Sequence, residues 1–202
     1  MTLGADESTT LHVVVLAAGA STRFGSPKQL VRVNGRPLMH AVVGRAVEVA
    51  GHSVTVVLGA NAAELAPLLK HTPASVIVNR EWSEGMASSI RAGVSRLPSS
   101  CTGVLLLLAD QAAVTADDLR RLVSTWRRQP EYIVAAQYSG TTGAPAIFPR
   151  TSFVDLAGLR GDSGARSVFM RNPDRVVRVR MESAALDIDT PEDLLGITPS
   201  EP

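Results

Sequence analysis

Short runs of Val, Ile and Leu alternate along this chain with longer segments whose apolar residues recur every three or four positions. The short runs predict β-strands at His12–Leu16, Ser53–Leu58, Ala74–Val78, Gly103–Ala109, Tyr132–Gln137, Ala144–Phe148 and Arg175–Val179. The longer segments predict helices at Pro37–Ala50, Asn61–Lys70, Ala87–Leu97 and Ala116–Arg128. Strands that alternate with helices predict an α/β fold, in which a mostly parallel sheet is covered by helices on both faces.

Two of the predicted helices begin beside residues that are suited to capping. Thr115 precedes one of them, with Asp117 and Asp118 in the first turn, where carboxylates are favoured. Asn61 is available as the cap of another. Ligands of open parallel sheets bind beyond the carboxyl ends of the strands. The loops that follow the strands are therefore where we look for chemistry.

Composition indicates a single domain and excludes some classes of partner. The chain has 202 residues, of which 45% are hydrophobic and 19% charged, which suits one compact core. We expect one domain at residues 12–196, with flexible tails at residues 1–11 and 197–202. The formal net charge of +1 argues against nucleic acid or an anionic membrane surface as a partner.

Cysteine content and apolar run length predict a cytoplasmic protein. The single cysteine, Cys101, cannot form an internal disulfide and excludes a zinc site built from thiolates. Residues 1–11 include Asp6 and Glu7 and lack a basic start followed by an apolar stretch, so they do not predict a signal peptide. The longest apolar run, Val104–Ala109, is far shorter than the ~20 residues that a membrane span requires.

The loop after the first predicted strand, residues 17–28, carries the clearest chemistry. Its small residues let backbone N–H groups approach a ligand closely, and Gly19 and Gly25 allow unusual backbone angles. Arg23 and Lys28 add two cations that suit a polyphosphate. The alternative is a glycine-rich turn whose charges face water. Neither GxxxxGK[ST] nor GxGxxG occurs, which argues against a Walker-type NTPase and a standard dinucleotide site.

Four segments of the chain, taken in order, resemble one family. They read LAAGASTRFGSPKQL at residues 16–30, NREWSEGMASSIRAG at 79–93, LLADQ at 107–111 and DIDTPEDL at 187–194. Together they resemble the MobA-like nucleotidyltransferases, and in detail the molybdenum cofactor cytidylyltransferase branch. The resemblance implies a three-layer, mostly parallel Rossmann-like sheet of the nucleotide-diphospho-sugar transferase type. It also implies transfer of CMP from CTP to the phosphate of molybdopterin, with release of pyrophosphate.

The resemblance assigns nucleotide contacts to two of these segments and to Asp110. The residues are Leu16, Ala17, Ala18, Gly19, Arg23, Lys28, Gly85, Ser89 and Asp110. Arg23, Lys28 and Asp110 are the expected catalytic residues, and Ser89 lies where related cytidylyltransferases contact the base. An alternative for the second segment is that Gly85 and Met86 simply begin a helix.

A magnesium ion is the cofactor that the resemblance implies, held by Asp110 and Asp189. Asp110 ends the most apolar predicted strand, where a carboxylate is costly unless it meets a cation or hydrogen-bond donors. Carboxylate oxygens suit Mg²⁺, which also binds waters and substrate phosphates. The alternatives are that Asp110 caps a turn and that Asp189 caps a helix, while Asp187 orients the loop.

Two shorter matches to the same family imply which residues contact the phosphate acceptor. Gly161, Asp162 and Arg166 stand in a segment that resembles the family's L-x-G-D-x-G-A-R, and Gly143 and Pro145 in one that resembles its G-x-P. A molybdopterin-type phosphate acceptor is the implied partner, together with a molybdoenzyme or its maturation chaperone. A glycine-stiffened turn before a helix is the alternative.

One residue departs from the family pattern, and several others have no predicted chemical role. Ala112 replaces the family's proline after Asp-Gln, which we expect to loosen the loop beside Asp110. The four histidines are scattered and predict surface or capping roles, Cys101 lacks an identified base, and Trp82 and Trp126 predict packing.

Three other functions remain open at this point. One is transfer from GTP or another NTP to a different phosphate acceptor. Another is a non-catalytic chaperone that presents the cofactor to a molybdoenzyme. A redox role is the third, because some relatives with this domain carry oxidoreductase labels.

Overall fold

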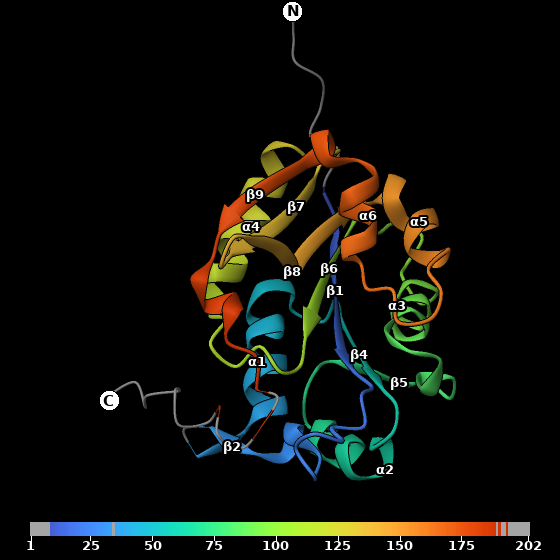
Figure 1. The fold of residues 1–202 in the computed structure, drawn as a ribbon, viewed down its shortest axis with the longest axis vertical. Coiled ribbons are helices and arrows are strands. Elements are labelled where there is room, and N and C mark those ends of the chain that lie inside the picture. The colour runs from blue at the N-terminus through green and yellow to red at the C-terminus, as the bar shows by residue number, and fades with distance from the viewer. Residues whose placement is uncertain (1–8, 34, 189, 191–192, 194–202) are drawn as a thin grey trace, which may run out of the picture.

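A seven-stranded sheet forms the centre of the computed structural model, which describes residues 9–33, 35–188, 190 and 193 (Figure 1). The strand order is β5-β4-β1-β6-β8-β7-β9. The strands are β1 (Leu11–Ala17), β4 (Val54–Leu58), β5 (Ser75–Val78), β6 (Gly103–Leu108), β7 (Ile133–Tyr138), β8 (Thr141–Pro149) and β9 (Val176–Arg180). Each predicted strand is present within one to three residues of its predicted bounds. A small hairpin of β2 (Arg32–Val33) and β3 (Arg36–Pro37) lies apart.

One strand runs against the rest of the sheet. β8 is antiparallel to both β6 and β7, whereas the other neighbouring strands pair in parallel. The reversal follows from the link between β7 and β8, where Ser139 and Gly140 have φ of 46° and 71°. Positive φ at both central residues is typical of a two-residue hairpin turn. The predicted mostly parallel α/β fold is therefore confirmed.

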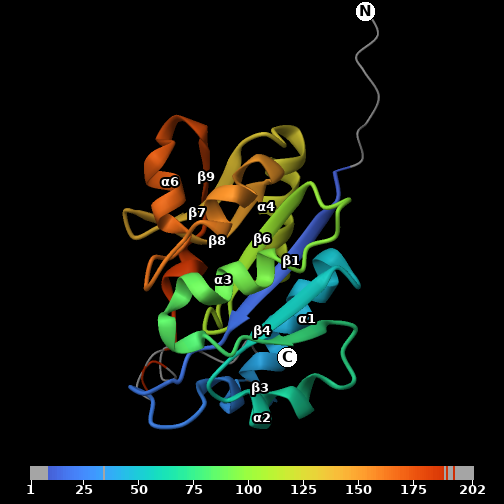
Figure 2. The ribbon, with the colours of Figure 1, turned by 90° about the vertical axis from the view of Figure 1, so that its right-hand side faces the viewer.

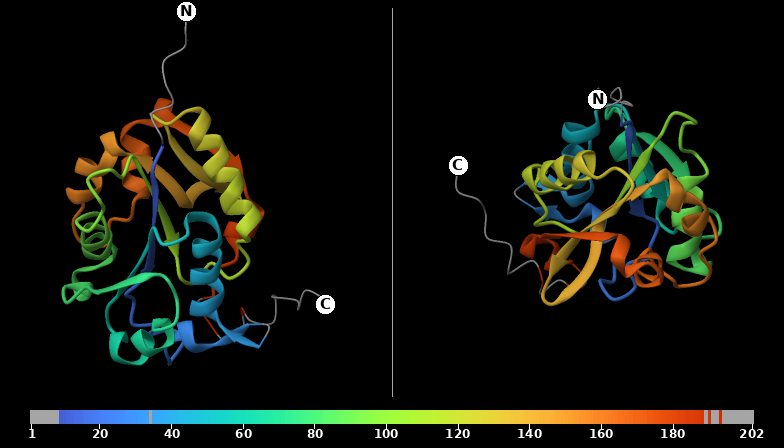
Figure 3. Two further views of the ribbon diagram at one scale, coloured as in Figure 1. Left: turned by 180° about the vertical axis from the view of Figure 1, so that it is seen from behind. Right: turned by 90° about the horizontal axis from the view of Figure 1, so that it is seen from above.

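Helices cover both faces of the sheet (Figures 1 and 2). One face carries α1 (Leu38–Ala50) and α4 (Ala116–Arg128), with α2 (Ala62–Leu65) near the sheet's end. The other face carries α3 (Met86–Val94), α5 (Phe153–Ala157) and α6 (Arg166–Arg171). The view from above in Figure 3 shows the three layers. No helix among the described residues is both long and apolar enough to cross a membrane.

Short 3-10 segments connect these elements. They are η1 (Lys28–Leu30), η2 (Ala66–Leu69), η3 (Trp82–Glu84), η4 (Arg150–Ser152), η5 (Pro173–Arg175) and η6 (Glu182–Ala185). The first and third lie in the two segments that the sequence analysis assigned to the nucleotide. The predicted helix at residues 61–70 is thus a single α-turn continued by η2.

The predicted caps have different outcomes. Thr115 forms a reciprocal capping box, because its hydroxyl accepts from the Asp118 amide while the Asp118 carboxylate accepts from the Thr115 amide. Asn61 stands before α2, but its side chain makes no capping hydrogen bond, so that prediction is wrong. The Asn61 amide nitrogen is instead buried without a partner among the described residues.

One histidine lies in the interior and not at the surface. His12 was expected at the surface, but it lies on β1, is 8% exposed and bonds through Nε2 to the Thr55 hydroxyl on β4 (2.9 Å). Burial lowers the pKa of His12. Trp126 is buried as predicted, and Cys101 is buried with its thiol pKa raised, chiefly by that burial.

Candidate active site

A cavity of about 570 Å³ opens beyond the carboxyl ends of β1 and β6. The predicted nucleotide residues all line it: Leu16, Ala17, Ala18, Gly19, Arg23, Lys28, Gly85, Ser89 and Asp110. Asp162 of the predicted acceptor group lines it as well, whereas Gly143, Pro145, Gly161 and Arg166 do not. The fold therefore brings together three segments that are far apart in the sequence.

The first loop is held in shape by Ser21. Its carbonyl accepts hydrogen bonds from the amides of Phe24 (3.0 Å) and Gly25 (3.1 Å), and its hydroxyl accepts from the Lys28 amide (3.3 Å). Ser21 itself has a φ of 54°, a left-handed conformation that costs energy for a residue other than glycine. These bonds fold the loop back on itself and anchor the backbone of Lys28 at the cavity wall.

Lys28 and Asp110 form an ion pair in the lining of the cavity. Lys28 Nζ lies 2.7 Å from Asp110 Oδ2, and the side chains are 14% and 21% exposed. Asp110 Oδ1 is buried and accepts no hydrogen bond within the described part of the chain. The pair joins residues 82 positions apart, so the cation and carboxylate that the resemblance singled out meet at one point.

The loop that follows Asp110 is firmly tied, contrary to the expectation from Ala112. The Ala112 amide donates to the Asp110 carbonyl (2.8 Å), a bond that a proline could not make, and Arg45 donates to the Ala112 carbonyl (2.7 Å). Gln111 donates to the Ala144 carbonyl of β8 (2.9 Å). Ala112 lacks the fixed backbone angle of a proline, but the N–H of Ala112 closes the turn with a hydrogen bond.

Ser89 is oriented by a small buried network at the start of α3. Asn79 Nδ2 donates to the hydroxyls of Ser88 (2.8 Å) and Ser89 (3.1 Å), and Ser88 donates to the Gly85 carbonyl (2.9 Å). Because Ser89 accepts from Asn79, its own proton can be donated to an acceptor atom in the cavity. Ser89 is 5% exposed and borders the cavity.

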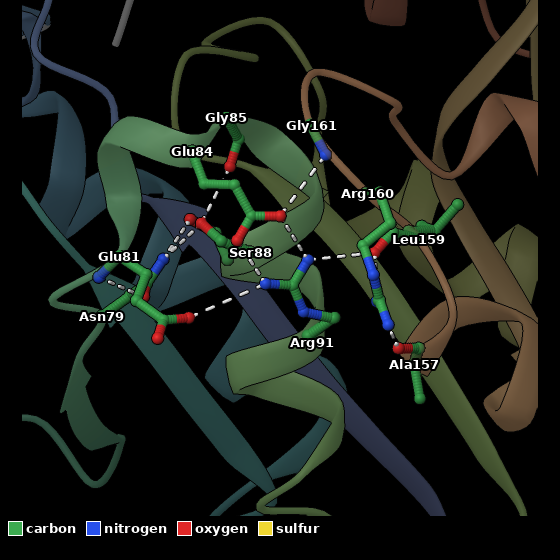
Figure 4. Close-up of polar contacts among 11 residues, drawn as sticks. Asn79, Glu81, Glu84, Gly85, Ser88, Arg91, Ala157, Leu159, Arg160 and Gly161 are labelled. Carbon is green, nitrogen blue, oxygen red and sulfur yellow. Dashed lines mark hydrogen bonds and ion pairs between the residues drawn. The ribbon is translucent and has the colours of Figure 1, made fainter.

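The ion pair between Glu84 and Arg91, here called the fork, connects the start of α3 to the 159–161 loop (Figure 4). Arg91 donates to both carboxylate oxygens of Glu84 (2.9 and 2.6 Å) and to the Leu159 carbonyl (2.9 Å). The Gly161 amide contacts Glu84 Oε1 (3.4 Å), and the Ala87 amide donates to the Gly161 carbonyl (3.1 Å). The hydrogen bond from Arg91 lowers the pKa of Glu84 and raises that of Arg91.

Gly85 has a structural reason to be glycine. Its φ is 116°, and a Cβ there would lie 2.3 Å from Asp162 Oδ1 and 2.6 Å from the Gly161 carbonyl oxygen. Only glycine therefore lets the 161–162 loop lie directly on the beginning of α3. The same contact places the Asp162 carboxylate at the cavity.

Two of the remaining predicted acceptor residues, Gly143 and Arg166, lie near Tyr138, which was not predicted from the sequence. A Cβ on Gly143 would lie 2.5 Å from the Tyr138 hydroxyl. The pKa of Tyr138 is raised mainly by burial, with the Asp187 and Asp110 carboxylates also raising it and Arg166 lowering it. Tyr138 thus lies within electrostatic reach of both Asp110 and Arg166.

The predicted metal pair can be described only for Asp110, because Asp189 lies outside the described residues. Ile188 donates its amide to the Asp110 carbonyl (3.1 Å), which brings the chain up to Ile188 beside Asp110. The described residues contain no cluster of three or more His, Cys, Asp or Glu side chains that could hold a metal ion. Mg²⁺ needs no such cluster, since it commonly binds one or two carboxylates plus water and phosphate.

Trp82 was misread from the sequence. It was expected to pack, yet it is 37% exposed and lines the cavity. Met86, which begins α3 as the alternative for this segment proposed, is 43% exposed and lines the cavity as well. The signal that could have found Trp82 is its place in the N-x-x-W segment, three residues before Gly85, which lines the cavity.

Comparisons with known proteins show the family of this chain. Residues 13–176 match the MobA-like NTP transferase domain. Nicotine blue oxidoreductase of Paenarthrobacter nicotinovorans is 34% identical over 193 residues, covering 90% of this chain and 93% of that protein. Purine catabolism protein PucB of Bacillus subtilis is 30% identical, covering 89% and 92%.

A solved structure with the same architecture is that of Rv0371c from Mycobacterium tuberculosis H37Rv. It has 28% sequence identity and a TM-score of 0.81, covering 94% of this chain and 97% of that one. A second crystal structure of that protein is a complex with manganese, at 27% identity and a TM-score of 0.79, covering 96% and 100%. The domain match spans most of the chain, so the chain belongs to the MobA-like NTP transferase family, and its enzyme class is nucleotidyltransferase.

Proposed function

We propose that this protein transfers CMP from CTP to the phosphate of a molybdopterin-type acceptor. An oxygen of the acceptor phosphate attacks the α-phosphorus of CTP, a new P–O bond forms, and the bond to the β-phosphate breaks to release pyrophosphate. No covalent enzyme intermediate is needed, because the acceptor is already an anionic nucleophile. The protein's work is then positioning and charge neutralisation.

The observation that carries the proposal is the opposed pair of Lys28 and Asp110 in the cavity. A cation and a carboxylate 2.7 Å apart, beside a loop of small residues, suit a triphosphate that displaces the carboxylate from the ammonium group. Lys28 then binds phosphate oxygens, and Arg23 on the same loop adds a second cation at the cavity. In this proposal both cations neutralise the negative charge that develops on the leaving pyrophosphate.

Asp110 also fits a divalent cation. Its Oδ1 is buried without a partner among the described residues, which is costly for a carboxylate oxygen unless something else binds there. The manganese complex of the Mycobacterium tuberculosis relative supports a divalent metal in this family. We propose that Asp110 and Asp189 hold Mg²⁺. When bound, the ion supplies charge neutralisation at phosphate oxygens.

Ser89 is the proposed contact for the base, and the Asp162 side of the cavity is proposed to receive the acceptor. The Ser89 hydroxyl, which Asn79 holds in place, donates to a carbonyl or ring nitrogen, and cytosine offers both. Gly143, Pro145, Gly161, Asp162 and Arg166 are proposed to contact the acceptor. The choice of cytosine and of molybdopterin rests on the sequence resemblance.

A pyrophosphate-release assay tests the proposal. The purified chain is supplied with molybdopterin carrying molybdenum and with CTP, GTP, ATP or UTP, in the presence of Mg²⁺. We expect release only when nucleotide and acceptor are both present, fastest with CTP. Asp110→Asn should slow release by about 100-fold or more, because a group that stabilises transition-state charge is lost.

Asp117→Asn is the matched control, because Asp117 is an exposed carboxylate on α4 that does not border the cavity. It should leave the rate unchanged. Full activity of Asp110→Asn with Mg²⁺ would refute the metal and phosphate assignment. Fastest release with GTP would keep the reaction and correct the nucleotide. Product formation by the isolated chain would exclude a purely carrier role.

The relative named nicotine blue oxidoreductase favours a redox reaction as a second candidate function, because it is 34% identical over nearly its full length. The two candidates differ in what they consume. Oxidation of NADH or NADPH by the purified chain, followed by absorbance with a redox dye as acceptor, would support the second. Dependence of product on CTP and acceptor, without nicotinamide oxidation, would support the first.

A further inference from the structure

Trp82 is a large apolar side chain that the fold leaves exposed inside its charged cavity. Among the described residues, the exposed large hydrophobic side chains are Val76, Val78, Trp82, Met86, Val154, Met170 and Leu186. Only Trp82 and Met86 of this group line the cavity. Leaving an indole 37% exposed forfeits stabilisation that burial would give, so its position suggests a ligand that covers it.

The position of Trp82 depends on a close approach to Gly59. A Cβ at Gly59 would lie 2.7 Å from Trp82 Cβ and 2.5 Å from the Ala18 carbonyl oxygen. The missing side chain therefore lets the backbone of Gly59 lie directly against both Trp82 and Ala18 of the first loop. The Ala18 carbonyl also accepts from the Ala60 amide (3.1 Å), which ties the first loop to the segment under Trp82.

The lining of the cavity has two kinds of chemistry. Arg23, Lys28 and Asp110 carry charges that suit phosphates and their counter-ion. Ser89 offers a hydroxyl, and Trp82 and Met86 offer apolar surface. Asp162 adds a carboxylate beside Gly85, which repels phosphate and accepts N–H groups. A ligand with an anionic tail and a planar nitrogenous ring matches both kinds of chemistry.

We propose that the indole of Trp82 stacks on the base of the bound nucleotide and supplies most of the binding that the ring adds to the triphosphate. The inference rests on the proposed function, since it takes an NTP as the ligand. Stacking on an aromatic side chain tolerates any base, because every base has a π-face. Trp82 thus contributes affinity for the ring, whereas hydrogen bonds such as that of Ser89 contribute choice among bases.

Nucleotide affinity of full-length variants tests the proposal, measured by calorimetry with Mg²⁺ present. Trp82→Ala should weaken binding of CTP and of GTP by about 10- to 100-fold, the range expected for loss of one base stack. Trp82→Phe should stay within a few-fold of the wild type, because a flat ring remains. Inorganic tripolyphosphate, which has no ring, should bind all three proteins alike. Val154→Ala is the matched control, an exposed apolar residue outside this cavity.

Fluorescence gives a second measurement that does not depend on a variant's affinity. The chain has two tryptophans, and Trp126 is fully buried, so acrylamide quenching of the wild type reports Trp82. CTP should protect this fluorescence and tripolyphosphate should not. In Trp82→Phe the protection should disappear.

Several outcomes would overturn the proposal, and they can be told apart. Equal CTP affinity in Trp82→Ala and wild type refutes the stack while leaving nucleotidyl transfer intact. Equal losses for CTP and tripolyphosphate show that Trp82 only supports the loop. Unchanged CTP affinity with a raised KM for the acceptor assigns the ring to the acceptor instead. Absence of any NTP binding by the wild type refutes the proposed function as well.

Discussion

Lys28 and Asp110 neutralise each other when no substrate is bound, and this pairing explains why a half-buried charge is tolerated at the end of the most apolar strand. The side chains are 14% and 21% exposed, so each would be costly alone. The triphosphate that we propose as ligand must compete with this internal partner. Lys28 is therefore poised to exchange one anion for another.

Replacing Lys28 is the sharpest test at the scale of one residue. Lys28→Met should slow pyrophosphate release by about 100- to 1,000-fold, because a fixed cation no longer stabilises the charge that develops on phosphate. The chain's only other lysine, Lys70, is exposed, so Lys70→Met provides the control and should retain the wild-type rate in the same assay. A Lys28→Met enzyme with more than half of the normal rate would contradict the assignment.

At the scale of elements, the fork between Glu84 and Arg91 joins α3 to the 159–161 loop, which carries Asp162 to the cavity. Both side chains are partly exposed, so solvent screening leaves the pair only a small contribution to global stability. Its effect is local: the fork holds the loop in one place relative to Ser89 and Gly85. Arg91 is in this sense a positioning residue.

Arg91→Met should raise hydrogen exchange at the backbone of residues 159–163 and leave the unfolding free energy nearly unchanged. The physical reason is that the Leu159 carbonyl and Glu84 lose their shared donor. Exchange measured by mass spectrometry on peptides from this loop checks it. Arg120→Met, which removes the exposed pairs to Glu48 and Asp117 on the opposite helical layer, should leave the loop's exchange unaltered. Equal protection in Arg91→Met and wild type would show that backbone contacts alone hold the loop.

Some elements could be predicted from the sequence and others could not. The central strands were predictable because runs of apolar residues are buried there from both faces, as at residues 13–15 of β1 and 104–107 of β6. The helices α5 and α6, of five and six residues, are too short to display a period. The reversal of β8 depends on the turn at Ser139 and Gly140, which an apolar pattern does not report. The first loop and Asp110 were found by motif resemblance, but the close approach of Trp82 to Gly59 joins residues that are distant in sequence.

At the scale of the whole molecule, stability should depend on pH through His12. The buried imidazole has a lowered pKa, chiefly through burial, whereas in the unfolded chain it titrates near its ordinary value of 6.5. Below that value the unfolded state binds the proton more readily than the folded state. The stabilising contribution is thus present above pH 6.5 and is lost as the pH falls.

Urea unfolding at a series of pH values checks this expectation. The free energy of unfolding of the wild type should decrease between about pH 7 and about pH 5. His12→Gln should flatten this part of the curve, because glutamine does not titrate. Asp118, whose pKa is lowered despite burial by its hydrogen bonds to Thr115, Ser183 and Arg121, acts only at lower pH, below its ordinary value of 3.8. Parallel curves for wild type and His12→Gln would contradict the assignment to His12.

The reversed strand β8 has a practical consequence for protein engineering. Since β7 points the same way as β6, the turn at residues 139–140 stands at the edge of the sheet where the cavity opens. It joins two strands that pair with each other, so extra residues inserted there would extend a surface hairpin and leave the hydrogen-bond ladder intact. Libraries that vary the length of this turn can therefore reshape the rim on the Tyr138 side while the half of the sheet that carries Lys28 stays untouched.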